Sequence, residues 1–311
     1  MQNYLSNLIL NTDSYKTSHY LQYPPKTAYV SCYIESRKGA LQPLLFFGIQ
    51  AFIKAYLLNP IKSKDIQQAK AFLTQHGLPF NNDGWEYILK KHKGFLPIEI
   101  QALPEGTIIN SKNVLVQVIN TDPKCYWLTT YIETMLLRAI WYPTTVATLS
   151  YHCKKVIKSY LSETEGNTEN LNYKLHDFGA RGVSSLESAS IGGMAHLINF
   201  EGTDTISGIL AAKTFYGEKM AGISIPAAEH NCIMAWGEKN EQDAYKTLLD
   251  MFLKPNQMVS IVSDTYDIKH AIKHIWCDKL KNIVSNSDGT LIIRTDSGNP
   301  VKMVIETLEI L

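Results

Sequence analysis

The densest group of chemically capable residues is the segment HDFGARG, residues 176–182. Its glycines let the backbone approach a ligand closely. Arg181, which lies between them, can bind a phosphate through two parallel hydrogen bonds, and Phe178 can stack on a planar ring. Taken alone, the segment is explained equally well as a glycine-rich turn after a strand, with Arg181 paired to a surface carboxylate.

Four later segments place carboxylates, a histidine or an arginine among small residues: EGTD (201–204), PAAEH (226–230), SDTYD (263–267) and RTDSGN (294–299). His230 can accept a phosphoryl group as a nucleophile. Asp264, Asp296 and Arg294, with the hydroxyl residues beside them, suit a ribose phosphate or a Mg²⁺–phosphate ligand. Each segment also has an ordinary explanation, such as Asp204 capping the helix that follows it. Five such segments in succession favour a functional site over five unrelated turns.

Each of the five segments ends a short apolar run, which indicates strands that carry polar side chains at their carboxyl ends. The runs cover 173–182, 195–205, 222–230, 259–267 and 291–299, with helical patterns between several of them. This spacing is typical of βα units. Because α/β barrels and open parallel sheets present their active sites at such strand ends, we predict an α/β domain over 171–311 that carries the substrate site.

The first part of the chain, residues 1–170, has a mixed pattern that predicts an α+β domain. Apolar spacing predicts a helix over 46–59. A serine at its start and a glycine at its end predict another helix over 63–77. Alternating apolar and polar residues over 96–119, separated by Pro-Glu-Gly, indicate strands joined by a turn.

Two further helices are expected over 126–141 and 145–162, with a break at Tyr142-Pro143 because a residue that precedes proline disfavours the helical conformation. Near the start of the chain, TDSYK (12–16) is typical of a helix N-cap and first turn.

Composition excludes several classes of protein. The chain has 311 residues, of which 45% are hydrophobic and 19% charged, so it can bury a sizeable core and wholesale disorder is excluded. Thirty basic residues against 29 acidic ones leave a net charge of +1, so no long-range basic field favours nucleic acid or an anionic membrane. Only four of the basic residues are arginines, and arginine is expected where a planar fork cannot be replaced by lysine.

The five cysteines are widely scattered and form no CxxC pair, which favours a reducing cytosol over a disulfide framework or a cysteine-rich zinc site. The N-terminal residues lack the basic and apolar regions of a signal peptide, and no apolar run is long enough to span a bilayer. We expect a cytoplasmic protein that binds neither membrane nor nucleic acid. The sequence identifies no set of metal ligands.

Seven segments together resemble the nicotinamide phosphoribosyltransferase family, which is related to the nicotinate phosphoribosyltransferases. They are TDSYKTSHYLQYPP, KLHDFGARGVSS, NFEGTDT, SIPAAEH, AWG, VSDTYDI and IIRTDSGNP, and they occur in the family's order along essentially the whole chain. The resemblance implies that nicotinamide and phosphoribosyl pyrophosphate give nicotinamide mononucleotide and pyrophosphate, a step of NAD salvage. It also implies Mg²⁺ at the diphosphate, ATP coupling through a phosphohistidine, and a homodimer with a shared active site.

The resemblance assigns several residues to the nicotinamide. Phe178 is expected to stack on the pyridine ring, and Tyr15 of the other subunit to cover the opposite face. Asp204 is expected to accept a hydrogen bond from the carboxamide, and Arg181 to hold a ring substituent or phosphate. Ser224 and Ala227 belong to the same set of expected substrate-binding residues.

The resemblance assigns the remaining residues to the phosphates and to catalysis. His230 is the expected phosphorylated residue, and Asp264 and Asp296 are expected to serve the ribose, the metal or the nucleotide. Three further residues are expected to bind substrate: Arg294 at a phosphate, Asp13 in the same cleft, and Arg37 approaching the phosphates from the neighbouring subunit.

Specificity follows from charge at Asp204. A carboxamide offers N–H donors to this side chain, whereas nicotinate would place a carboxylate against it and be repelled. We therefore favour the amide-using enzyme, with nicotinate phosphoribosyltransferase as the alternative. Two departures from the family pattern are Ala180, at a position that is often aromatic, and Thr295, where proline is common.

The implied fold is a type II phosphoribosyltransferase-like structure, with the α+β domain followed by a TIM-like α/β barrel. A closed barrel of this kind needs eight strands, and we count about five. We therefore expect an incomplete barrel and a C-terminally truncated member of the family. A second alternative, of a different class, is a catalytically incomplete product that acts only as a binding or dimerising partner.

Overall fold

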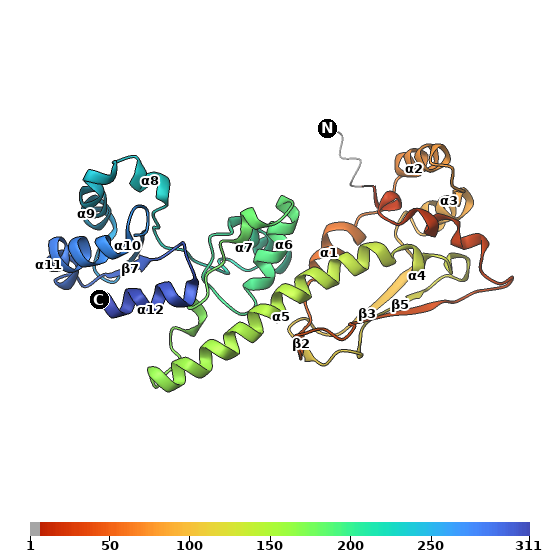
Figure 1. The fold of residues 1–311 in the computed structure, drawn as a ribbon. Coiled ribbons are helices and arrows are strands. Elements are labelled where there is room, and N and C mark those ends of the chain that lie inside the picture. The colour runs from red at the N-terminus through yellow and green to blue at the C-terminus, as the bar shows by residue number, and fades with distance from the viewer. Residues whose placement is uncertain (1–6) are drawn as a thin grey trace. The chain divides into compact units, whose positions relative to one another are not determined.

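The computed structural model describes residues 7–311 and contains both helices and strands, as the α/β prediction requires (Figure 1). Its chain divides into two compact units, of which the first ends at Ile223 and the second is Ser224–Leu311. The predicted domains, with their boundary at residue 170, stay a prediction. Among the described residues, no helix is both long enough and apolar enough to cross a membrane.

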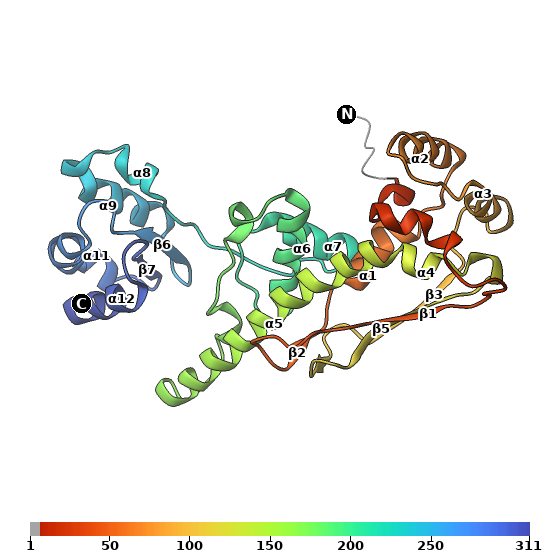
Figure 2. The same cartoon turned by 45° about the vertical axis from the view of Figure 1, so that its right-hand side comes forward.

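The first unit contains an antiparallel sheet of three strands, in the order β1-β5-β3. The bounds are Ser31–Glu35 for β1, Ile98–Ala102 for β3 and Val114–Asn120 for β5. A second pair joins β2 (Leu44–Leu45) to β4 (Ile108–Ile109). Val116 and Val118 of β5 pack with Met135 and Leu136 of helix α5 (Glu133–Thr164), which lies along the sheet (Figure 2). The strands predicted over 96–119 are confirmed.

Helix α5 spans Glu133–Thr164 without interruption, so the predicted break at Pro143 is wrong. The segment that precedes helix α1 (Ile49–Phe52) packs against α5 at this point. A Cβ on Gly48 would come within 2.7 Å of the Ala139 carbonyl oxygen, which Pro143 cannot bond for lack of an N–H. The Thr144 hydroxyl donates to the Phe47 carbonyl at 3.0 Å and accepts from the Phe47 N–H at 3.2 Å. These contacts stabilise the helix at the point where Pro143 interrupts its backbone hydrogen bonds.

Three other helices of the N-terminal half pack around an aromatic core: α2 (Ser63–Gln75), α3 (Asn82–Lys91) and α4 (Leu128–Tyr131). A further helix, α1 (Ile49–Phe52), continues as a π-helix over Ile53–Leu57 and packs with the sheet and α5 instead. The helices predicted over 46–59 and 63–77 are thus confirmed in type. Trp85, Trp127 and Tyr131 contact one another edge-on, with ring centroids 4.8–5.6 Å apart. The segment predicted as an N-cap begins a 3₁₀ helix, Ser14–Leu21.

Two helices complete the first unit, α6 (Leu186–His196) and α7 (Ile206–Tyr216). They pack closely because glycines face each other: a Cβ on Gly208 would lie 2.7 Å from the carbonyl carbon of Gly193. Parallel bridges join Asp177 to Thr203 and Gly202 to Ile223. The runs predicted as strands over 173–182 and 195–205 therefore pair in parallel, but only at isolated bridges.

The second unit contains the parallel strands β6 (Met258–Val262) and β7 (Thr290–Arg294), both predicted. A parallel bridge between Ala227 and Ser260 extends this pair, so the run predicted over 222–230 also contributes a single bridge. Its helices are α8 (His230–Met234), α9 (Glu241–Phe252), α10 (Ile268–His270) with a π-helix over Ala271–Lys279, α11 (Lys281–Ser285) and α12 (Pro300–Ile310). Tyr245 and Trp276 stack at 4.6 Å in its core. Every strand pairing here is parallel, as βα units require.

Candidate functional site

In the second unit, three predicted segments meet at the carboxyl ends of parallel strands. Asp264 follows β6, Asp296 and Ser297 follow β7, and His230 begins α8 after the bridge at Ala227. The Nε2 of His230 donates to Asp264 Oδ1 at 3.0 Å. The structure therefore brings His230 and Asp264 together across 34 residues of sequence, because adjacent parallel strands end at the same edge.

Asp264 is held from its other oxygen as well. Its Oδ2 accepts the backbone N–H groups of Asp296 at 2.8 Å and Ser297 at 2.6 Å, and the Ser297 hydroxyl at 2.6 Å. Burial raises the pKa of this carboxyl, but the hydrogen bonds from Ser297 and His230 outweigh burial and lower the pKa to about 2. Asp264 is therefore an ionised and fixed acceptor at neutral pH.

Arg294 and Asp296 lie on the other side of His230. The Arg294 guanidinium binds Asp296 Oδ1 at 2.5 Å and donates to the Ala228 carbonyl at 2.9 Å. Asp296 Oδ2 is 3.8 Å from His230 Nδ1, and the His230 side chain is 37% exposed. In the neutral imidazole with its proton on Nε2, toward Asp264, Nδ1 is the nitrogen with a lone pair. An accessible, oriented imidazole of this kind can act as a nucleophile.

In the first unit, the segment HDFGARG and Asp204 lie at neighbouring strand ends. His176 Nε2 donates to Asp204 Oδ1 at 2.9 Å, and the Asp204 N–H donates to the Asp177 carbonyl at 2.7 Å. The N-cap residue of α7 is Thr205, so the capping explanation of Asp204 is wrong. The arrangement holds a carboxylate at an exposed strand end, where it can accept an N–H from a ligand.

A cavity of about 460 Å³ opens beside this segment. Tyr142 and Leu149 of α5, His196 of α6, and His176, Phe178 and Ala180 line it. Phe178 is 64% exposed, which leaves its ring available for stacking. Burial lowers the pKa of His196, so this histidine is a neutral part of the wall. The cavity thus joins an apolar, aromatic wall to a few polar groups, as sites for planar ligands do.

The remaining predicted residues have contacts of other kinds. Asp13 accepts from the Thr134 hydroxyl, and the Tyr15 ring lies edge-on to His19 at 5.0 Å. Arg181 and Arg37 are exposed. Two predicted residues of the second unit, Ser224 and Ala227, are also exposed, and Ala227 pairs with Ser260 through its backbone.

Two groups were missed by reasoning from the sequence alone, His176 and Ser297. Both lie inside segments that the sequence singled out, so proximity to Phe178 and Asp296 was the available signal. Their role depends on bonds to Asp204 and Asp264, which are remote in sequence.

Two sequence profiles match the chain. Residues 7–100 match "Nicotinamide phosphoribosyltransferase, N-terminal domain", and residues 173–311 match the "Nicotinate phosphoribosyltransferase (NAPRTase) family".

Two curated relatives are both called nicotinamide phosphoribosyltransferase. The protein of Xanthomonas campestris is 49% identical over 99% of this chain and 66% of its own length. The protein of Acinetobacter baylyi is 33% identical over 94% of this chain and 62% of its own length. The chain thus spans a little under two thirds of these relatives' length.

The fold also has solved counterparts. Human nicotinic acid phosphoribosyltransferase aligns with a TM-score of 0.61 at 15% identity, over 96% of this chain and 63% of that one. At such low identity the likeness supports the fold alone, and it confirms the predicted phosphoribosyltransferase-like architecture.

Proposed function

The chain belongs to the nicotinamide phosphoribosyltransferase family, and on that basis we propose that it transfers the phosphoribosyl group of phosphoribosyl pyrophosphate to nicotinamide. The products are nicotinamide mononucleotide and pyrophosphate. One observation carries the proposal, namely 49% identity over 99% of the chain to a relative that bears this name. The strand-end groups described above include the aromatic, carboxylate, arginine and histidine side chains that such a transfer needs.

Recognition of nicotinamide is assigned to Phe178 and Asp204. The exposed Phe178 ring stacks on the pyridine, and Tyr15 of a second subunit covers its other face. Asp204, oriented by His176 at 2.9 Å, accepts an N–H of the carboxamide. Nicotinate would bring a second carboxylate to this position and be repelled, so the amide is the preferred base.

The transfer breaks the bond between ribose C1 and the diphosphate and forms a bond from C1 to the pyridine nitrogen. Its transition state is oxocarbenium-like, so the protein mainly positions the reactants and neutralises the departing charge. Arg181 and Arg294 have the planar fork that binds phosphate oxygens, and Arg37 of the second subunit approaches the same phosphates. Ser224, Ala227 and Asp13 border the substrates.

We propose that Asp296 binds the Mg²⁺ of the reaction. Asp264, which accepts the backbone N–H of Asp296, helps to position it. Asp296 is exposed and offers carboxylate oxygens beside Arg294, and Mg²⁺ in phosphate sites takes one or two carboxylates together with substrate oxygens. When bound, the ion neutralises charge on the departing diphosphate.

ATP coupling is assigned to His230. Asp264 holds the proton on Nε2, which leaves Nδ1 to attack the terminal phosphorus of ATP. The bond between that phosphorus and the bridging oxygen breaks, ADP leaves, and a phosphohistidine remains. Its later hydrolysis drives the transfer toward the mononucleotide.

A homodimer is supported by one face of α5. Leu137, Trp141, Leu149, Val156 and Tyr160 are each at least 40% exposed although they are apolar or aromatic. An apolar stripe of this kind is typical of a surface that pairs with another chain. We assign it to a second copy, which also supplies Tyr15 and Arg37, and the scattered cysteines favour the cytoplasm as the place of reaction.

The test is an assay of the purified 311-residue chain with nicotinamide, phosphoribosyl pyrophosphate and Mg²⁺, with and without ATP. Formation of nicotinamide mononucleotide that ATP increases supports the proposal. Faster turnover of nicotinate would favour the acid-using alternative. Nicotinamide binding by calorimetry without any product would favour the binding partner.

A further inference from the structure

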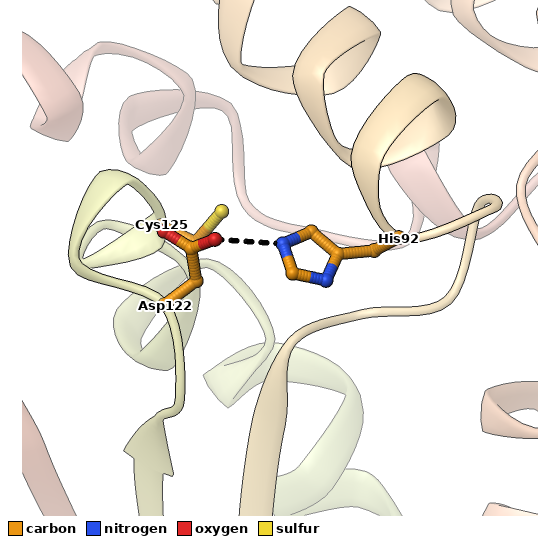
Figure 3. A group of neighbouring side chains, drawn as sticks. All are labelled: His92, Asp122 and Cys125. Carbon is orange, nitrogen blue, oxygen red and sulfur yellow. Dashed lines mark hydrogen bonds and ion pairs between the residues drawn. The ribbon is translucent and has the colours of Figure 1, made fainter.

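A second group of chemically capable side chains lies in the first unit, at the edge of its aromatic core. It consists of His92, Asp122 and Cys125 (Figure 3). His92 caps the carboxyl end of α3, and the other two residues begin and end the short helical turn that follows β5. One nitrogen, one oxygen and one sulfur atom of these side chains lie within 4.8 Å of one another. The group therefore joins α3 to the connection after β5.

The three atoms belong to the ligand types that zinc prefers. A tetrahedral zinc site has bonds of about 2.0 Å to nitrogen and about 2.3 Å to sulfur, so neighbouring ligand atoms lie about 3.5 Å apart. His92 Nε2 and Asp122 Oδ2 are 2.8 Å apart, and the sulfur lies within 4.8 Å of one ligand nitrogen of His92 and one carboxylate oxygen of Asp122. A small opening of the first pair and a small approach of the sulfur bring all three to bonding distance.

The surroundings of Asp122 already orient it as a ligand is oriented. The backbone N–H of Lys124 donates to Oδ1 at 2.9 Å, and the Tyr87 hydroxyl donates to Oδ2 at 3.0 Å. Such outer hydrogen bonds fix the ligands of metal sites. The side chains of His92 and Asp122 are 25% and 14% exposed, which leaves a solvent path for an ion and for a water as the fourth ligand.

A nucleophilic Cys–His–Asp triad is a poorer explanation of the same residues. Cys125 is 0% exposed, and burial raises the pKa of its thiol to about 12. A reactive cysteine needs exposure and a lowered pKa. His92 directs Nε2 at Asp122 rather than at the sulfur.

We propose that His92, Asp122 and Cys125 form a zinc site that fastens α3 to the turn after β5. The Cys125 proton passes to solvent as the sulfur–zinc bond forms, and His92 carries its remaining proton on Nδ1. The role is structural, since the site adjoins the aromatic core of Trp85 and Trp127. It is independent of the proposed transferase reaction.

The test uses Co²⁺ as a probe for zinc in the purified full chain. We expect one Co²⁺ per chain, with a thiolate-to-cobalt charge-transfer band and the strong visible bands of a four-coordinate ion, and we expect Zn²⁺ to displace it. Excess Zn²⁺ should also raise the melting temperature by several degrees. A wild-type chain that gives no thiolate band with excess Co²⁺ overturns the proposal.

Variants locate the site. Cys125→Ser should abolish the thiolate band, whereas Cys32→Ser on β1 should keep it. His92→Gln should weaken Co²⁺ binding by ~10-fold or more, whereas His76→Gln, at the matching carboxyl end of α2, should not. A band that survives both Cys125→Ser and His92→Gln refutes the assignment. If Cys125→Ser fails to fold, the His92→Gln and His76→Gln comparison decides.

Discussion

Ser297 holds Asp264 through two hydrogen bonds of 2.6 Å, one from its backbone N–H and one from its hydroxyl, to the same carboxylate oxygen. The opposite oxygen of Asp264 receives His230. A residue in the turn after β7 thereby sets the orientation of an imidazole at the start of α8. The relationship makes the turn after β7 part of the machinery proposed for phosphoryl transfer.

Replacing Ser297 by alanine should slow phosphorylation of His230 by ~10-fold, the cost of about one charge-assisted hydrogen bond. The quantity to measure is the rate of acid-labile phosphohistidine formation from ATP. Ser297→Thr keeps the hydroxyl and serves as the control. Equal rates for the alanine variant and the wild type would remove Ser297 from the positioning role.

Acid should weaken the fold through Asp264. Its pKa lies near 2 in the folded chain, below the ordinary value of 3.8, so ionised Asp264 contributes stability that is complete above about pH 4. This contribution, about 2 kcal/mol, is lost as pH falls from 4 through 2. Urea unfolding of the wild type and of Asp264→Asn at a series of pH values measures it. The difference between the two chains should shrink across that interval, and a constant difference would contradict the assignment.

His230→Ala should abolish coupled ATP hydrolysis while some ATP-independent transfer remains, because the phosphoryl acceptor is lost but the nicotinamide groups are not. The measurements are ADP release and mononucleotide formation in the same sample. His274→Ala, an exposed histidine of the same unit, is the matched control. Coupled hydrolysis that persists in His230→Ala would exclude the phosphohistidine.

Asp204→Ser should reduce the preference for nicotinamide and add some use of nicotinate, because the repelling carboxylate is removed. The ratio of kcat/KM values for the two bases should fall by ~10-fold or more, as expected when repulsion between two carboxylates at a recognition site is removed. Asp243→Ser, on the exposed face of α9, controls for general effects of losing a carboxylate. An unchanged ratio would end the role of Asp204 in specificity.

Gly48→Ala should destabilise the first unit by ~2–4 kcal/mol. The residue has a φ of +115°, and a Cβ there meets the Pro143 ring and the Ala139 carbonyl. Gly106→Ala is the control, since Gly106 also has a positive φ, +88°, but nothing lies near its Cβ position. The melting temperatures of the two variants should differ by several degrees. Equal losses of melting temperature in the two variants would show that backbone strain alone, and not the contact with Pro143, destabilises them.

The sequence by itself determined the family, the strand-end segments and most of the helices. Local sequence patterns were sufficient to predict α2, which has a serine at its start and a glycine after its end. They were also sufficient for β6 and β7, because a short apolar run is a pattern of neighbouring residues. The same kind of reasoning was wrong at Pro143, where Thr144 and Gly48 support a helix that local preference would break.

Tertiary structure alone decided which of the singled-out side chains touch. His230 with Asp264, Asp264 with Ser297, and His176 with Asp204 are separated by about thirty residues in each case. Spacing predicted that these segments end neighbouring strands, but it did not predict which side chains bond to one another. They arise because parallel strands carry distant segments to a common edge, where directional hydrogen bonds over about 3 Å select one arrangement of the side chains.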